Sequence, residues 1–186
     1  MIRIDQRLVA ALTEEALRLF FPLSAIYAAL WPFLWTWLFS LNLPLTRSTP
    51  PSVWHGHEMI YGAYGAALLG FILTAVPEGT NQARPSPRFL LVLASLWGVG
   101  RFVGLLGADW ANLLAWLADA AWLGALIVFV ASISVRTRRS NLGGFVFWLV
   151  ILLACEASAR WAIFQEDVLL AQTALRSALL AFAALL

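Results

Sequence analysis

Long apolar runs constrain this chain more than any other feature of its sequence. A membrane span needs roughly 20 apolar residues to cross about 30 Å of hydrocarbon. Six stretches meet or approach that length, at Ala16–Leu41, Glu58–Val76, Phe89–Leu106, Trp110–Ile133, Gly143–Arg160 and Val168–Leu186. Because backbone polar groups in lipid must be satisfied within the segment, these runs predict α-helices. The expected fold is an all-α, polytopic membrane domain over residues 16–186.

The composition supports a membrane protein and excludes several other classes. The chain is 62% hydrophobic and 12% charged, whereas a soluble domain is about half apolar and about a quarter charged. The net charge of +2 is modest, and the arginines lie in loops rather than on one dense face, so we expect no nucleic-acid binding. A phosphate-binding glycine loop, a nucleophile elbow and a paired-cysteine zinc motif are all missing from the sequence. Whether the protein is an enzyme stays open.

The two ends of the chain carry separate expectations. Residues 1–15 precede the first span, and Leu8, Leu12 and Glu15 follow helical spacing. This segment predicts a short amphipathic helix that lies in the inner interface as an anchor. The last apolar run stops at Leu186 without a polar tail, which is typical of a truncated chain or a half-length gene product.

Arginines in short loops predict the orientation of the spans. One side of the six-span arrangement carries most of them, namely Arg3, Arg7, Arg84, Arg88, Arg136, Arg138 and Arg139. Arg47 and Arg160 fall on the other side. The first side is therefore expected to be cytoplasmic, together with both termini. The proline-containing loop Asn42–Trp54 then faces outward, and the residues that follow it lie near the outer face.

Both histidines of the chain lie directly after that loop, in Trp54-His55-Gly56-His57-Glu58-Met59. Imidazole is the commonest metal ligand, so histidine-based cofactor chemistry must start here. Ser52 is placed to cap the helix of the second span. On a regular helix, residues two apart point about 200° from each other, which separates the two imidazoles. In an extended start they project to the same face and can hold one ion.

A regular helix predicts different neighbours for the two imidazoles. His55 then shares a face with Glu58 and Met59, and His57 with Tyr61 and Tyr64. A copper ion accepts imidazole with thioether or carboxylate support, whereas haem needs one axial imidazole and an apolar groove. The alternative is that these histidines are ordinary membrane-edge residues without a ligand.

Ionisable groups within the spans gather at a similar depth. Counting about 1.5 Å per residue, Arg101 lies roughly 8 Å, Asp119 roughly 13 Å and Glu156 about 6 Å below the outer edge. One hypothesis is structural, with Arg101–Asp119 and Glu156–Arg160 as ion pairs. In the other, Arg101 and Arg160 neutralise haem propionates or an anionic ligand, while Asp119 and Glu156 support histidine or relay protons. Cys155 is either a soft ligand or, as is more common, a buried inert thiol.

Several segments together resemble the opening of the NnrS family. They are Arg18-Leu19-Phe20-Phe21-Pro22, the histidine motif, Gly70-Phe71-Ile72-Leu73-Thr74-Ala75-Val76-Pro77, Trp97-Gly98-Val99-Gly100-Arg101 and Arg138-Arg139-Ser140-Asn141-Leu142. The resemblance implies a bacterial inner-membrane protein associated with haem, copper and the response to nitric oxide. It implies that His55 and His57 are haem or copper ligands and that Glu58 and Met59 lie beside them. Members of that family are longer, with further histidines in the second half, so the chain is similar to their N-terminal half.

Two functions from different classes follow. The first is a haem- or copper-binding membrane protein of the nitric oxide response, which predicts that a histidine lies in the outer half near Arg101 and Glu156. The second is a cofactor-free membrane module that assembles with itself or with a partner subunit, which predicts histidines that point to headgroups or water. A small transporter is less well supported, because no span shows the Gly/Pro interruption at mid-depth that is typical of a broken helix.

Overall fold

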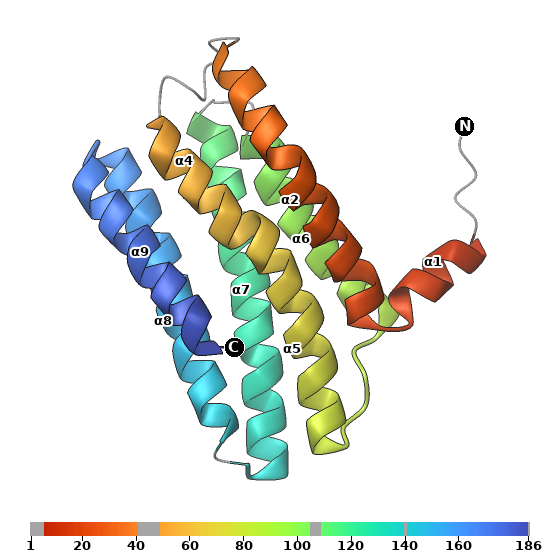
Figure 1. Ribbon diagram of the computed structural model, residues 1–186. Coiled ribbons are helices and arrows are strands. Elements are labelled where there is room, and N and C mark those ends of the chain that lie inside the picture. The colour runs from red at the N-terminus through yellow and green to blue at the C-terminus, as the bar shows by residue number, and fades with distance from the viewer. Residues whose placement is uncertain (1–5, 41–48, 105–108, 140, 186) are drawn as a thin grey trace.

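The chain folds into a bundle of helices. The computed structural model describes residues 6–40, 49–104, 109–139 and 141–185, and every regular element in these ranges is a helix. The all-α prediction is therefore confirmed. In chain order the helices are α1 (Gln6–Thr13), α2 (Ala16–Ser40), α4 (Pro51–His57), η1 (Glu58–Tyr64), α5 (Gly65–Thr80), α6 (Pro87–Gly104), α7 (Asp109–Thr137), α8 (Leu142–Phe164) and α9 (Val168–Leu185) (Figure 1).

Five helices of the described ranges are long and apolar enough to cross a membrane. They cover Ala16–Trp37, Pro51–Thr80, Trp110–Thr137, Leu142–Phe164 and Val168–Leu185. The remaining expected span, Phe89–Leu106, coincides with α6 up to Gly104, and its last residues lie outside the described ones. Helix α6 has 18 residues, two of which are arginines. It is not one of the five helices that are long and apolar enough to cross a membrane. A polytopic helical membrane protein is what this arrangement shows.

The second span begins earlier than the sequence predicted. Its helix runs through α4, η1 and α5 from Pro51 to Thr80 rather than starting at Glu58. Pro50 occupies the N-cap without a side-chain cap bond, so the prediction that Ser52 caps this helix was wrong. A proline at the first helical position has the required φ already, which explains the start at Pro51. Both histidines therefore lie within the helix rather than at its edge.

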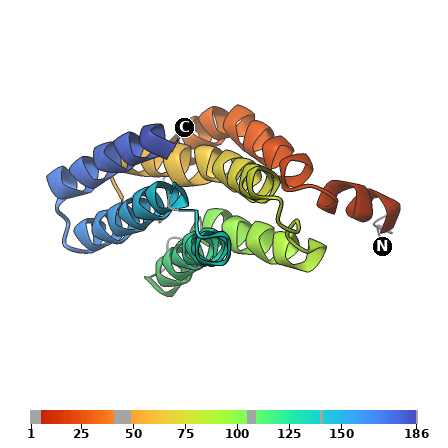
Figure 2. The same cartoon turned by 90° about the horizontal axis from the view of Figure 1, so that it is seen from below.

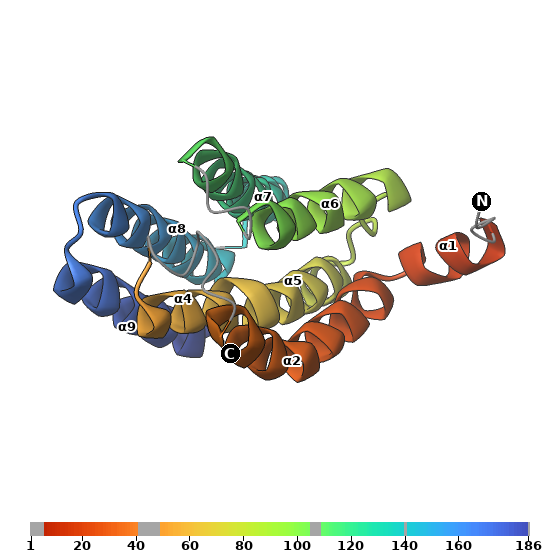
Figure 3. The ribbon, with the colours of Figure 1, turned by 90° about the horizontal axis from the view of Figure 1, so that it is seen from above.

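The bundle has two layers, seen end-on in Figures 2 and 3. One layer contains α9, the long α4–η1–α5 helix and α2, and the other contains α8, α7 and α6. In the most apolar window of the long helix 72% of the residues are buried, against 11–39% in the other four spans. This helix is therefore the central element of the fold. The outer surfaces expose large apolar side chains such as Phe33, Phe164 and Leu180, as a lipid-facing surface requires.

The N-terminal helix lies outside the bundle. A bend at Glu14 and Glu15 separates α1 from α2, and α1 projects away from the other helices (Figure 1). Glu15 forms an ion pair of 3.0 Å with Arg84 in the connection between α5 and α6. Leu8 on α1 is more than half exposed. The division into an N-terminal segment and a transmembrane domain stays a prediction, as does the position of this segment in the membrane interface.

The arginine-rich connections lie at one end of the bundle, as the alternation of the helices requires. The connections between α5 and α6 and between α7 and α8 are both at the end where α2 begins (Figure 1). They carry Arg84, Arg138 and Arg139. Arg3 and Arg47 lie outside the described residues. Which end faces the cytoplasm stays a prediction.

Close packing of α2 against α5 depends on a small residue. A Cβ atom at Gly70 would lie 3.1 Å from the Cβ of Phe20 and 3.6 Å from the Cα of Leu17. Small residues let helix backbones approach closely in lipid. By contrast, a Cβ atom at Gly124 on α7 would meet nothing within 4 Å. The two glycines therefore form a matched pair for testing the packing.

Replacing Gly70 with valine is expected to destabilise the protein by about 1–3 kcal/mol, the usual range for overpacking. Gly124→Val adds the same side chain to a helix interior but meets open space, so it isolates the packing effect from helix propensity. The measurement is thermal unfolding in detergent, followed by tryptophan fluorescence. Equal melting temperatures for the two variants would contradict the close contact between α2 and α5.

Candidate functional site

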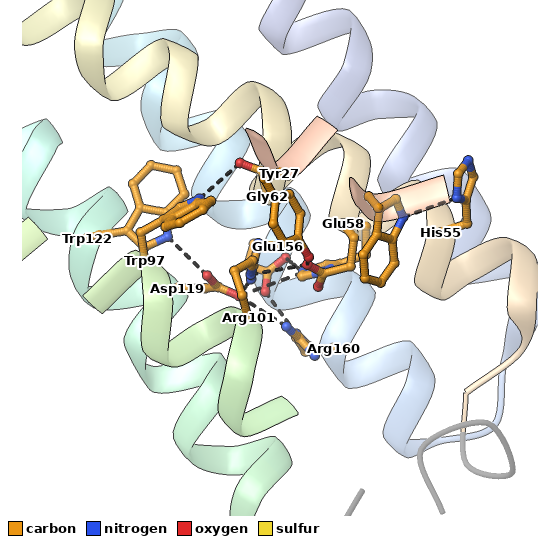
Figure 4. A network of polar contacts seen from close by, with 12 residues as sticks. Tyr27, His55, Glu58, Gly62, Trp97, Arg101, Asp119, Trp122, Glu156 and Arg160 are labelled. Atoms are coloured by element: carbon orange, nitrogen blue, oxygen red, sulfur yellow. Dashed lines mark hydrogen bonds and ion pairs between the residues drawn. The ribbon is translucent and has the colours of Figure 1, made fainter. Parts of the chain in front are cut away.

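A cluster of ionisable side chains lies inside the bundle, where both layers meet (Figure 4). We call it the buried polar cluster. Its members are Tyr27 of α2, His57 of α4, Glu58 of η1, Arg101 of α6, Asp119 of α7, and Glu156 and Arg160 of α8. Relative exposure is 5% or less for His57, Glu58, Arg101, Asp119 and Glu156. Arg101, Asp119 and Glu156, for which the sequence predicted a similar depth, thus belong to one network of contacting side chains.

The π-helix η1 shapes one wall of this cluster. A π-helix has i→i+5 hydrogen bonds and often occurs at functional sites, and here it begins at Glu58, directly after His57. Two carbonyl oxygens of η1 accept hydrogen bonds from other helices. Trp97 Nε1 donates to the Gly62 carbonyl at 2.9 Å, and Ser24 Oγ donates to the Ala63 carbonyl at 2.7 Å.

Gly62 in η1 allows the close approach of Tyr27. A Cβ atom there would lie 2.5 Å from the Tyr27 ring and 3.2 Å from Glu58 Oε2. The absence of a side chain lets the Tyr27 hydroxyl donate a hydrogen bond of 2.5 Å to Glu58 Oε2. Glycine at this position is therefore a geometric requirement of the cluster.

His57 bridges two carboxylates. Its Nδ1 lies 3.0 Å from Glu58 Oε1 and its Nε2 lies 2.9 Å from Glu156 Oε2, with Asp119 Oδ2 at 3.9 Å. An ionised carboxylate only accepts hydrogen bonds. With both glutamates ionised, each ring nitrogen must donate, and His57 is then an imidazolium ion.

The neighbours of His57 match the regular-helix prediction only in part. Its ring lies 5.0 Å from the Tyr61 ring, as predicted. Tyr64 is exposed and contacts Phe182 instead. The π-helix supplies the reason, because its wider turn rotates the later residues away from the face of His57.

Both predicted ion pairs are formed, and Asp119 connects one pair to the other through Arg160. Arg101 Nη2 lies 2.5 Å from Asp119 Oδ2, and Arg160 Nε lies 2.9 Å from Glu156 Oε1. Arg160 Nη2 also donates to Asp119 Oδ2 at 3.1 Å. On its other side, Arg101 Nε lies 3.2 Å from Glu58 Oε2. What the sequence predicted as two separate pairs is one connected network.

The charges of the network balance when one further positive charge is present or when one carboxylate is protonated. Three carboxylates, of Glu58, Asp119 and Glu156, face two guanidinium groups, of Arg101 and Arg160. Net charge in a low-dielectric interior is strongly unfavourable. A proton on His57 makes the cluster neutral, and so does any other cation that supplies the missing charge.

His55 lies apart from the cluster (Figure 4). Its Nδ1 accepts a hydrogen bond of 3.2 Å from Trp31 Nε1, and its ring lies 5.0 Å from the Trp35 ring. Because an indole N–H only donates, neutral His55 carries its proton on Nε2. The two histidines therefore occupy different environments and do not face one common ion.

The expected supporting residues divide between these two environments. Glu58 contacts His57, and it also bonds to Tyr27 of α2. Trp31, the partner of His55, stacks on Tyr27, so the predicted shared face of Glu58 and His55 is consistent with these contacts. Met59 packs against Trp31 and Trp54, near the partner of His55. Cys155 is partly buried and packs against the hydrophobic core.

The comparison with known families identifies the chain. The family model described as NnrS protein matches residues 11–186. The chain belongs to the NnrS family. No curated protein and no solved structure matches it. The resemblance recognised in the sequence is thus confirmed over most of the chain.

The cofactors associated with the NnrS family can be tested against this geometry. One ligand atom each from His57, Asp119 and Glu156 lie within 4.8 Å of one another. A nitrogen-and-oxygen donor set of this kind fits a divalent transition-metal ion, Cu(II) included. The described residues therefore fit a metal ion.

Haem does not fit the described residues as they lie. Haem needs an axial imidazole that faces an apolar groove, whereas both ring nitrogens of His57 face carboxylates of the chain. The Nδ1 of His55 accepts from Trp31, which leaves its proton on Nε2. Arg101 and Arg160 bind carboxylates of the chain, so a role in holding haem propionates finds no support in their contacts.

Several residues in and around the buried polar cluster were not predicted from the sequence. Tyr27 was treated as part of an apolar run, although Ser24 three residues before it lies on the same helical face and also bonds to η1. Trp97 and Trp122 were not singled out, yet Trp122 Nε1 donates to Asp119 Oδ1 at 3.0 Å. An indole N–H in a buried run needs an acceptor, and that signal was present in the sequence.

A double-mutant cycle tests the link between Arg101 and Asp119. Arg101→Met and Asp119→Asn are each expected to destabilise the protein by about 3–5 kcal/mol, because each leaves a buried charge without its partner. Their coupling free energy should be about 0.5–3 kcal/mol, measured by thermal or denaturant unfolding in detergent. The control cycle pairs Arg101→Met with Arg18→Gln, which lies in an exposed pair with Glu14. Equal coupling in both cycles would rule out the contact.

Gly100 gives a second test of the position of Asp119. A Cβ atom there would lie 2.6 Å from Asp119 Oδ1, whereas at Gly98, on the same helix, it would meet nothing within 4 Å. Gly100→Ala is expected to lower the melting temperature because Asp119 must shift. Gly98→Ala should leave it unchanged or raise it, since alanine is favoured over glycine in helices by about 1 kcal/mol. A Gly100→Ala protein as stable as the Gly98→Ala protein would contradict the close approach of Asp119 to Gly100.

Proposed function

We propose that this chain is a multi-pass membrane protein of the nitric oxide response that binds a copper ion through His57, Asp119 and Glu156. The observation that carries the proposal is the orientation of the His57 ring. Its Nδ1 faces the Glu58 carboxylate, and its Nε2 faces the other two carboxylates. A metal-binding histidine almost always donates its second ring N–H to a carboxylate, carbonyl or water, which fixes the ring. Glu58 has that position here.

The charge balance supports a cation at the same place. The cluster contains one more carboxylate than guanidinium groups. A monovalent ion among His57, Asp119 and Glu156 would make the cluster neutral, whereas Cu(II) would change its net charge from −1 to +1. Arg160 Nε holds Glu156 at Oε1, which leaves Oε2 facing His57. Arg101 and Arg160 both contact Asp119 Oδ2, the oxygen that faces His57 Nε2, so this oxygen is positioned before an ion arrives but would share it with the two guanidinium groups.

When bound by His57, Asp119 and Glu156, a copper ion would supply the chemistry for binding a small diatomic ligand, and we assign nitric oxide to that role. The chain's own residues bind the ion and exclude bulk water, since its three ligands are nearly or fully buried. Haem is left out of the proposal, because His57 faces carboxylates rather than an apolar groove and Nδ1 of His55 accepts from Trp31. Met59 and His55 are likewise not ligands in this proposal.

The positive-inside rule supports an orientation for the protein. The connections at the α1 end carry Arg84, Arg138 and Arg139, and Arg88 and Arg136 lie at the adjoining helix ends. We propose that this end is cytoplasmic, in a bacterial inner membrane, with the N-terminus on the same side. The buried polar cluster then lies nearer the outer face, within reach of copper from that side.

A second candidate, a cofactor-free module that assembles with itself or a partner subunit, also has support. With His57 protonated the cluster is neutral, and its carboxylates are all paired. Such a cluster holds five helices together without a metal ion. Copper content separates the two candidates.

The test compares single histidine variants in protein expressed with copper supplied. Wild type is expected to bind one copper ion per chain, and His57→Asn to lose it. His55→Asn is the matched control and should keep it, because His55 lies outside the cluster. Elemental analysis gives the copper content, and gel filtration with circular dichroism verifies folding. Copper retained by the His57 variant, or lost equally from both, contradicts the assignment.

Electron paramagnetic resonance of wild type provides a measurement that needs no variant. The proposed donor set predicts coupling of Cu(II) to a single imidazole nitrogen, and coupling to two would overturn it. Addition of nitric oxide should change the spectrum of the copper-loaded protein. A wild-type protein that stays free of copper under these conditions supports the cofactor-free module instead.

A further inference from the structure

A cavity of about 140 Å³ opens at the arginine-rich end of the bundle, away from the buried polar cluster. It lies between the last turns of α5 and the start of α8, which are both at the lower end of the bundle in Figure 1. Its walls divide by chemistry. Phe71, Ile72 and Phe145 form an apolar part, and Arg139 and Asn141 form a polar rim.

Arg139 is held in place at this rim. Its Nη1 donates a hydrogen bond of 2.6 Å to the Gly79 carbonyl at the end of α5. Its own carbonyl accepts from Ser134 Oγ at 3.2 Å and from the Leu142 N–H at 3.3 Å. The preceding residue, Arg138, adopts a left-handed conformation with φ of 53°, which ends α7 and turns the chain toward α8. The guanidinium group is therefore oriented before any ligand binds.

The guanidinium of Arg139 retains capacity to bind an anion. It has five N–H donors, of which one is used by Gly79, and among the described residues no carboxylate pairs with it. Arg84, at the same end, differs because it pairs with Glu15 and Glu78. Arg136 and Arg138 are exposed near Arg139 and form no ion pair within the described ranges. The rim thus carries positive charge that has no carboxylate partner among the described residues.

We propose that this cavity binds one anionic phospholipid, with its phosphate at Arg139 and the start of an acyl chain along Phe71 and Phe145. Phe71 is 38% exposed, so the apolar part is open to the hydrocarbon side. The arginine lies just beyond the helix ends, at the level where headgroups lie. Basic pockets between membrane helices bind anionic headgroups in this way. The site is separate from the copper proposal and does not depend on it.

The experiment adds phosphatidylglycerol or phosphatidylcholine to the full chain in detergent and measures its melting temperature and, by native mass spectrometry, the bound lipid. Phosphatidylglycerol is expected to raise the melting temperature and to bind one molecule per chain. Arg139→Gln should weaken this binding about tenfold or more, as the loss of a charge-assisted contact predicts. Arg88→Gln is the matched control, an exposed arginine at the same end that does not line the cavity.

A second variant tests the apolar part without removing charge. Ala75 lines the cavity, and Ala75→Phe is expected to fill it and to abolish the specific binding. An equal effect of phosphatidylcholine, or an equal loss in Arg88→Gln, overturns the proposal. So does a shift of the same size with inorganic phosphate alone, since it identifies a free-anion site rather than a lipid site.

Discussion

Charge neutrality inside a low-dielectric bundle is the constraint on which this fold depends. Three carboxylates enter the interior from three different helices, and each would be unfavourable there without a partner. Arg101 and Arg160 reach Asp119 from two sides, so α6, α7 and α8 must lie side by side. His57 extends the same network to the central helix of the other layer. The two layers are thus joined by polar contacts as well as by apolar packing.

The π-helix lies at this junction between the layers. The carboxylate of its first residue, Glu58, faces His57, Arg101 and Tyr27. Hydrogen bonds from Trp97 and Ser24 to carbonyls of η1 support the wider turn. The local irregularity and the charged cluster therefore stabilise each other.

Hydropathy predicted the all-α membrane fold, because helices alone satisfy the backbone in lipid, and most span positions followed from the apolar runs. Residue counting also placed Arg101, Asp119 and Glu156 at one depth, which their contacts bear out. The first functional hypothesis predicted a histidine near Arg101 and Glu156, and His57 contacts Glu156, 99 residues away. That this histidine is His57 rather than His55 was not predictable, since it depends on which helices are neighbours across the layers. The π-helix escaped prediction because its stabilising partners, Ser24 and Trp97, come from other helices.

The two histidines show how strongly hydrogen-bond partners decide the role of an imidazole. They lie two residues apart, yet His55 meets a donor and His57 meets acceptors. The indole of Trp31 keeps Nδ1 of His55 unprotonated, so the proton of neutral His55 stays on Nε2. Glu58 instead holds a proton on Nδ1 of His57, which directs Nε2 toward Asp119 and Glu156. Replacing both histidines at once would remove both roles together. Only separate substitutions can therefore assign metal binding to His57.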